Sequence, residues 1–170
     1  ARHRRQNEGA IVTRIKICGL TDVESALAAA SSGAELLGLI FAPSKRQLTP
    51  EKAREIVDAV RNLSPCPAVV GLFVNLPAKE VNQIADFCRL DRVQLSGDED
   101  WSYCQDIART LIKVVHITKG KNAEKIIAEI ESGYRLLVNR DFICLLDAKA
   151  GGAYGGTGTT FDWRLAQEVS

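Results

Sequence analysis

Six short, almost continuously hydrophobic segments alternate with stretches of helical periodicity along these 170 residues. Segments with so few polar interruptions are typical of parallel strands that are buried on both faces. We predict strands at residues 14–18, 36–41, 69–74, 92–95, 111–117 and 142–146. We predict helices at residues 22–32, 50–62, 77–88, 100–110, 122–132 and 161–169. Strands that alternate with helices of this length pair in parallel through right-handed crossovers.

Two architectures fit this alternation, the doubly wound α/β sheet and the (β/α)8 barrel. The periodicity alone does not choose between them, but both bind ligands where the strands end at their carboxyl edge. No linker or shift in composition divides the chain, so we predict one domain. A short polar tail that carries Arg2, His3, Arg4 and Arg5 precedes it, at residues 1–13.

The composition excludes several classes of protein. A hydrophobic fraction of 46% and a net charge of +1 indicate a globular protein without an electrostatic reason to bind nucleic acid or an anionic membrane. No apolar run approaches the roughly 18 residues that cross a bilayer, and no signal peptide is recognisable. Five widely spaced cysteines and only two histidines form no zinc-binding pattern. We therefore expect a cytoplasmic protein that binds no metal.

A cysteine and an arginine follow the first two predicted strands. Cys18 ends the first strand just before Gly19, and this position makes a functional thiol as plausible as a small buried hydrophobic residue. The other four cysteines are expected to be structural, on helices or inside strands. Arg46 lies in the loop after the second strand, and its planar guanidinium suits a carboxylate or a phosphate. Asp98 and Glu99 are most simply the first-turn residues of a helix.

Asp147 comes directly after the sixth predicted strand, which it closes, and a glycine-rich loop follows it. We interpret Asp147 as an acid, because no second carboxylate or histidine motif lies nearby to complete a metal site. The loop contains Gly155 and Gly156, and it could hold a phosphate or move near the site. It is not a P-loop, because Thr157 stands where that motif needs a lysine. These residues together predict proton transfer on an anionic substrate, without naming that substrate.

Five motifs in this order resemble the phosphoribosylanthranilate isomerase family. They are residues 16–21 (KICGLT), 38–46 (GLIFAPSKR), 71–75 (GLFVN), 93–99 (VQLSGDE), and 145–147 (LLD) together with 155–163 (GGTGTTFDW). The resemblance implies a (β/α)8 barrel of which residues 14–170 would form about six of the eight units. It departs from the family at Ser96, where histidine is frequent, and at Thr159, where lysine is common.

The resemblance also implies a reaction, the Amadori rearrangement of N-(5-phosphoribosyl)anthranilate to 1-(2-carboxyphenylamino)-1-deoxyribulose 5-phosphate in tryptophan biosynthesis. Cys18 would be the general base and Asp147 the general acid, with no cofactor. Arg46 would hold the anthranilate carboxylate, and Gly155 and Gly156 would also bind the substrate. The only partner that this implies is the small phosphosugar-anthranilate molecule.

Two other hypotheses remain open. The sequence ends within the sixth helix and contains no methionine, so these residues are expected to be a portion of the enzyme with little activity by themselves. Such a partial barrel would have two open sheet edges, through which it could associate with itself or with a complementing piece. A different phosphosugar isomerase or epimerase is disfavoured, because those relatives are not expected to combine this cysteine with this arginine.

Overall fold

The computed structural model describes residues 13–118, 120–148 and 160–169, and contains one six-stranded parallel sheet. The predicted tail at residues 1–13 therefore lies almost entirely outside the described residues. The strands are β1 (Lys16–Cys18), β2 (Leu36–Ile40), β3 (Ala68–Phe73), β4 (Arg92–Leu95), β5 (Thr110–Ile117) and β6 (Phe142–Ala148). The helices are α1 (Val23–Ser31), α2 (Pro50–Val60), α3 (Ala78–Phe87), α4 (Ala123–Leu136) and α5 (Trp163–Val169).

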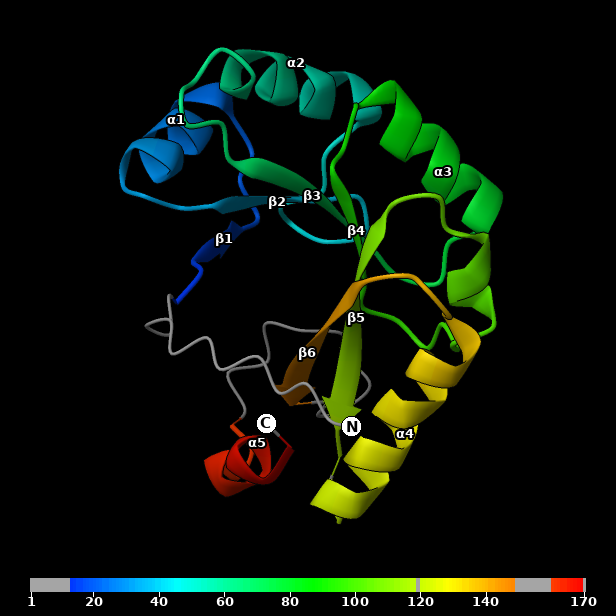
Figure 1. Ribbon diagram of the computed structural model, residues 1–170. Coiled ribbons are helices and arrows are strands. Elements are labelled where there is room, and N and C mark those ends of the chain that lie inside the picture. Colours follow the sequence, from blue (N-terminus) through cyan, green and yellow to red (C-terminus); the bar gives the residue numbers. More distant parts are fainter. Residues whose placement is uncertain (1–12, 119, 149–159, 170) are drawn as a thin grey trace, which may run out of the picture.

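The order of the strands decides between the two architectures. Each strand pairs with the next one in the sequence, so the order in the sheet is β1-β2-β3-β4-β5-β6. Figure 1 shows the sheet curling, with α1, α2, α3 and α4 along its outer side. A doubly wound sheet would reverse its strand order at a switch point and carry helices on both faces. The prediction of a partial (β/α)8 barrel is therefore confirmed.

Side chains alternate between the two faces of the curled sheet, as the pleat requires. On the outer face, residues such as Leu37 and Leu39 pack with Ile56 and Val57 of α2 in the main hydrophobic core. On the inner face a smaller cluster joins β2, β3 and β5; its members are Leu36, Val70 and Ile112. The central strands are thus buried on both sides, which explains their uninterrupted hydrophobic sequences.

Capping residues begin three of the helices where the sequence has them. The side chain of Asp22 accepts a hydrogen bond from the backbone N–H of Ser25 at 2.7 Å, and Thr49 accepts one from Lys52 at 3.3 Å. Asn122 caps α4 in the same way. Each cap satisfies a backbone donor that has no partner inside its helix, so the start of the helix is fixed by one polar residue.

The predicted helix at residues 100–110 is wrong. The chain forms only a four-residue 3-10 helix, η1 (Tyr103–Asp106), and β5 already begins at Thr110. The Asp100 side chain accepts hydrogen bonds from the Ser102 hydroxyl and the Tyr103 backbone, each at 2.7 Å, and so folds the segment into a tight turn. Trp101 becomes buried in this turn, and its ring packs beside Phe142 of β6 at a centroid distance of 5.1 Å.

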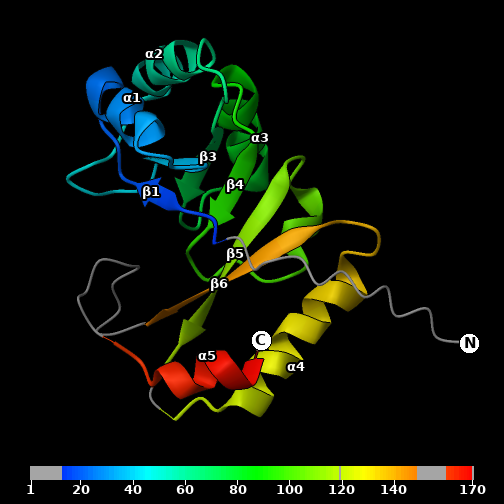
Figure 2. The ribbon, with the colours of Figure 1, turned by 60° about the vertical axis from the view of Figure 1, so that its left-hand side comes forward.

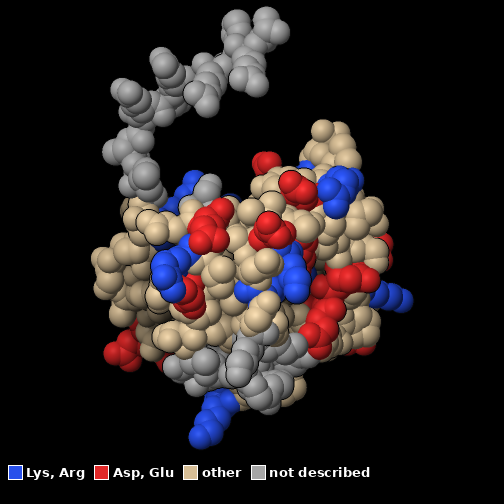
Figure 3. All heavy atoms as spheres, turned by 90° about the horizontal axis from the view of Figure 1, so that it is seen from below, with Lys and Arg blue, Asp and Glu red and all other residues tan. Residues whose placement is uncertain are grey.

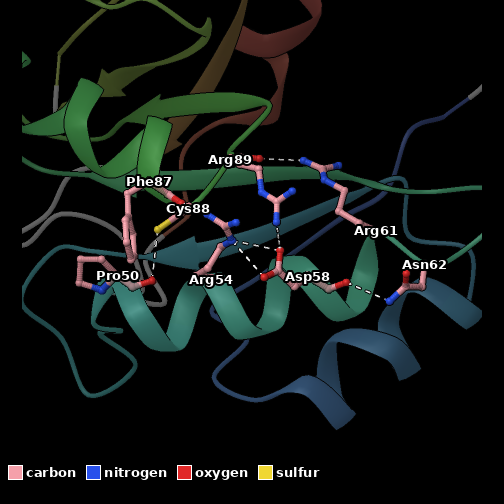
Figure 4. A network of polar contacts seen from close by, with 8 residues as sticks. All are labelled: Pro50, Arg54, Asp58, Arg61, Asn62, Phe87, Cys88 and Arg89. Atoms are coloured by element: carbon pink, nitrogen blue, oxygen red, sulfur yellow. Dashed lines mark hydrogen bonds and ion pairs between the residues drawn. The ribbon is translucent and has the colours of Figure 1, made fainter.

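A polar network joins α2 to the end of α3, at the edge of the sheet where β3 and β4 begin. Figure 4 shows Arg54 and Arg89 around the carboxylate of Asp58, with Arg54 also donating to the Phe87 carbonyl. Arg61 donates to the Arg89 carbonyl at 2.8 Å. Positive side chains at these carbonyls complement the negative end of the α3 dipole. This network stabilises the edge of the sheet where the strands begin, opposite to the edge formed by their carboxyl ends.

Gly133 in α4 gives a test of this packing. A Cβ atom built there would lie 2.7 Å from the ring of Trp101, so the glycine allows the indole to lie against the helix. Gly133→Ala should therefore destabilise the fold by about 1–2 kcal/mol, although alanine normally favours a helix by about 1 kcal/mol. Urea unfolding measures this difference in free energy. In a protein that already carries Trp101→Leu, Gly133→Ala should be neutral or stabilising. A Gly133→Ala single variant that is more stable than the unsubstituted protein would contradict this packing.

Candidate active site

The carboxyl ends of all six strands lie along one edge of the sheet, because every pair of neighbours is parallel. In Figure 2 the arrowheads of β3, β4, β5 and β6 point toward this same side. Parallel β/α proteins bind their ligands at this edge, where the loops that follow the strands meet. Cys18 and Asp147 both belong to it, as the last and the next-to-last residues of their strands.

The thiol of Cys18 lies on the inner face of the sheet, in space that Gly38 leaves open. Cys18 pairs with Gly38 on β2, whereas the preceding pair, Ile17 and Leu37, faces the helices. A Cβ atom built on Gly38 would approach the Cys18 sulfur to 2.6 Å, so any larger residue there would displace the thiol. Cys18 itself is half-buried. Its position is therefore set by close packing against the neighbouring backbone.

The guanidinium of Arg46 lies directly over the turn that follows Cys18. Its Nη1 atom donates a hydrogen bond to the Cys18 carbonyl oxygen at 3.3 Å. Gly19 has a φ of +84°, and a Cβ atom built there would lie 2.5 Å from the same nitrogen. Within the described residues Arg46 forms no ion pair with a carboxylate, and its side chain is exposed. The cation is thus held beside Cys18 with most of its donors available to an anion.

Asp147 lies inside β6, since that strand continues to Ala148, two residues beyond its predicted end. It pairs with His116 of β5, and both belong to the inner face because Val115 and Leu146 beside them pack toward the helices. The side chain of Asp147 is half-buried. An apolar strand thus positions a carboxyl group at the inner rim of the sheet.

The stagger of the strands places Cys18 and Asp147 at a similar height. The residues that pair in turn with Cys18 across β2, β3 and β4 lead to Thr110 on β5. Asp147 pairs with His116, which lies six residues further along β5. In a (β/α)8 barrel the register advances by about one residue for each strand. Five strand steps therefore account for nearly all of the offset. The two side chains face the inside of the curve at nearly the same level.

Glu99 joins the loops after β3 and β4, and it is not the first-turn helix residue that we expected. It is buried and accepts hydrogen bonds from the backbone N–H of Asn75 at 2.6 Å and of Gly97 at 2.8 Å. Asn75 has a φ of +52°, and its side chain accepts a hydrogen bond from the Asp98 backbone. Asp98 and Glu99 therefore do not lie in a helix. The Glu99 carboxylate and the Asn75 side-chain oxygen instead bind backbone N–H groups of the two loops.

Three of the remaining cysteines are structural. Burial raises the pKa of Cys88, Cys104 and Cys144 to about 11 each, so these thiols are protonated near neutral pH. Cys66 differs from the expectation, because it is exposed in the loop before β3, with its sulfur 3.6 Å from Nη1 of Arg61. It lies near the amino ends of the strands, away from the edge that carries Cys18.

Other predicted features are only partly described. Gly155, Gly156 and Thr159 lie outside the described residues. Among the residues that the structure does describe, no group of three or more His, Cys, Asp or Glu side chains could hold a metal ion. In the same ranges no helix has the length and hydropathy of a membrane span. Figure 3 shows one face of the molecule, on which side chains of both charges are interspersed.

The structure thus brings Cys18 and Arg46 into direct contact through neighbouring loops and places Asp147 on the same inner rim. The sequence did not single out His116, which pairs with Asp147 on the inner face, or the loop-joining contacts of Glu99. The pattern did contain a signal for His116, since a histidine at an inward position of an apolar strand, next to its last residue, lies at the active edge. No local signal marked Glu99, because its partners come from a loop 24 residues away.

Comparison with known proteins places these features in a family. Residues 15–170 match the family model described as N-(5'-phosphoribosyl)anthranilate (PRA) isomerase. The chain is 48% identical over 157 residues to the N-(5'-phosphoribosyl)anthranilate isomerase of Dehalococcoides mccartyi, and the match covers 92% of this chain and 71% of that protein.

Solved structures agree with this match. The phosphoribosyl anthranilate isomerase of Thermotoga maritima is 39% identical, with a TM-score of 0.70 over 91% of this chain and 70% of that one. A second structure is of such an isomerase in complex with reduced 1-(o-carboxyphenylamino)-1-deoxyribulose 5-phosphate. It is 37% identical, with a TM-score of 0.64 over 81% of this chain and 66% of that one. The chain therefore belongs to the N-(5'-phosphoribosyl)anthranilate isomerase family.

Proposed function

We propose that this protein catalyses the Amadori rearrangement of N-(5'-phosphoribosyl)anthranilate in tryptophan biosynthesis, with Cys18 as general base and Asp147 as general acid. The observation that carries the proposal is the placement of these two side chains on the inner rim of the same sheet edge. The family membership supports the reaction, and the complex of a relative with a reduced form of the product supports the substrate class.

Each group has a defined task in this reaction. Asp147 donates its proton to the furanose ring oxygen, so the C1–O bond breaks and the nitrogen lone pair forms an iminium at C1. The iminium withdraws electrons from C2, and Cys18 as the thiolate removes the C2 proton to give an enolamine. Tautomerisation of the enolamine yields the ketone. One proton leaves Asp147 and one arrives at Cys18, so exchange with solvent restores the enzyme without any redox step.

Arg46 is proposed to bind the anthranilate carboxylate. Its guanidinium is held over Gly19 by the hydrogen bond to the Cys18 carbonyl, so the cation lies beside the residue that supplies the base. A carboxylate that pairs with Arg46 would place the attached sugar within reach of Cys18. Because a planar guanidinium binds a carboxylate through two parallel hydrogen bonds, this contact also fixes the orientation of the substrate. Gly155 and Gly156 remain proposed substrate-binding residues.

Substitution of the proposed acid and base tests the mechanism. In the complete protein, Cys18→Ser and Asp147→Asn should each lower kcat by about a thousandfold or more, because each removes a proton-transfer group. The loss of substrate fluorescence in a steady-state assay measures the rate. Cys88→Ser is the matched control, since that buried thiol donates to the Pro50 carbonyl and a hydroxyl replaces the donor. Equal losses from all three variants would show that the site is misassigned.

A pair of glycines tests the role of Arg46. Gly19 and Gly33 both have positive φ angles, +84° and +92°, so alanine at either position should cost about 1–2 kcal/mol of stability. Only at Gly19 would the new methyl group displace the Arg46 guanidinium, because nothing lies within 4 Å at Gly33. Gly19→Ala should therefore raise KM about tenfold or more, through loss of a charge-assisted contact, while Gly33→Ala leaves KM unchanged. Equal KM values would contradict a substrate contact by Arg46.

The outer edges of β1 and β6 support a second proposal, association between two copies of this 170-residue chain. Each of these strands pairs with a single neighbour among the described residues, and Ile17, Ile143 and Leu145 are exposed on them. Unpaired backbone groups beside apolar side chains are a template for pairing with another chain.

We place the protein in the cytoplasm, where its five free cysteines would persist in the reduced state.

Sedimentation velocity at micromolar concentration tests this association. The 170-residue chain should sediment as a dimer or larger species, and Ile143→Lys should shift it toward the monomer by placing a charge on the exposed strand. A chain that remains monomeric throughout the micromolar range would contradict the proposal.

A further inference from the structure

His116 lies on β5 directly beside Asp147, and the proposed mechanism gives it no task. Its strand neighbours Val115 and Ile117 pack with Ile126 of α4 on the outer face of the sheet. The alternation of the strand therefore directs His116 to the inner face, at the carboxyl end of β5. The imidazole belongs to the same rim as the proposed acid.

Two hydrogen bonds anchor the His116 ring to the end of β4. Its Nε2 atom lies 3.1 Å from the Ser96 carbonyl oxygen and 3.2 Å from the Gly97 carbonyl oxygen. A carbonyl oxygen only accepts, so Nε2 must carry the hydrogen and donate it. The anchor is itself held in place, because Glu99 accepts a hydrogen bond from the Gly97 backbone at 2.8 Å. His116 thus connects the rigid end of β4 to the position beside β6.

The register brings this anchored ring next to the proposed acid. His116 and Asp147 are paired residues on adjacent parallel strands, so their Cβ atoms lie about 5 Å apart on the same face. We propose that His116 is a positioning residue for Asp147. The imidazole of His116 packs against the carboxyl group and keeps it directed into the mouth of the barrel. This inference rests on the proposed function, since it assumes that Asp147 is the general acid.

Charged groups also lie near His116. They are the Asp147 carboxyl on β6, Asp98 and Glu99 in the loop after β4, and Lys121. The Nζ atom of Lys121 donates to the His116 carbonyl at 2.9 Å and pairs with Glu129. Both the ring and the backbone of His116 are therefore held by neighbouring groups.

Two variants of the complete protein test the anchored ring. The His116→Gln variant retains an N–H donor near the position of Nε2, whereas His116→Ala removes both ring and donor. His116→Ala should lower kcat about tenfold with KM changed less than about threefold, because the carboxyl group is no longer held in place. His116→Gln should recover most of kcat.

The outcomes distinguish this inference from the proposed function. If Asp147→Asn is inactive in the same assay but His116→Ala keeps kcat within twofold, the positioning role is wrong while the proposed function stands. A His116→Gln variant that recovers none of the kcat lost in His116→Ala would overturn it as well. If Asp147→Asn retains full activity, the proposed function and this inference both fail. Thermal unfolding of each variant verifies that it is folded at the temperature of the assay.

Discussion

The hydrogen-bond register of the parallel sheet is the constraint on which the site depends. Each strand pairs with its neighbour in sequence, and the register shifts by about one residue at each step from β1 to β6. A one-residue slip in β6 would turn Asp147 toward the helices and Leu146 toward the interior. The hydrophobic residues on both faces prevent this slip, because they would have to exchange environments together. Core packing thus controls where the proposed catalytic groups point.

Two glycines, which lack a side chain, also help to place the groups of the proposed site. Gly38 leaves room for the Cys18 sulfur on the inner face, and Gly19 lets the Arg46 guanidinium lie against the backbone. Both contacts involve a functional group and the main chain of a neighbouring element, so they require little side-chain ordering when a substrate arrives. The opposite edge of the sheet differs, since charged pairs such as Arg89 with Asp58 join α2 to the end of α3 there. Stability and function occupy separate ends of the same strands, as in other β/α barrels.

The sequence predicted the strands and most helices because hydrophobic alternation and capping are local signals. Five of the six predicted helices form, and Asp22, Thr49 and Asn122 begin three of them. The predicted helix at residues 100–110 failed for a local and a non-local reason. The Asp100 side chain folds a tight turn, and Trp101 is buried against Gly133 and Phe142 far along the chain. Periodicity also left the barrel and the doubly wound sheet open, because both use the same local units. Strand order settles that choice, and only tertiary structure reveals it.

The residues of the proposed site divide in the same way. Cys18, Arg46 and Asp147 were recognisable because each was predicted to follow or close a strand, where chemistry is expected. Glu99 and His116 were missed because their contacts involve partners in other loops, the backbone of Asn75 and the carbonyls of Ser96 and Gly97. A sequence pattern identifies the groups that can react more readily than the groups that hold them.

The central claim is that Cys18 and Asp147 act on one substrate from the same inner rim. A crystal structure of the complete protein with reduced 1-(o-carboxyphenylamino)-1-deoxyribulose 5-phosphate, the compound bound by a relative, tests it most directly. The account predicts that the ligand lies between the two side chains, with its carboxylate on Arg46 and its sugar carbons within contact of the Cys18 sulfur. A ligand that binds at this edge but contacts neither Cys18 nor Asp147, or that binds elsewhere on the molecule, would contradict it.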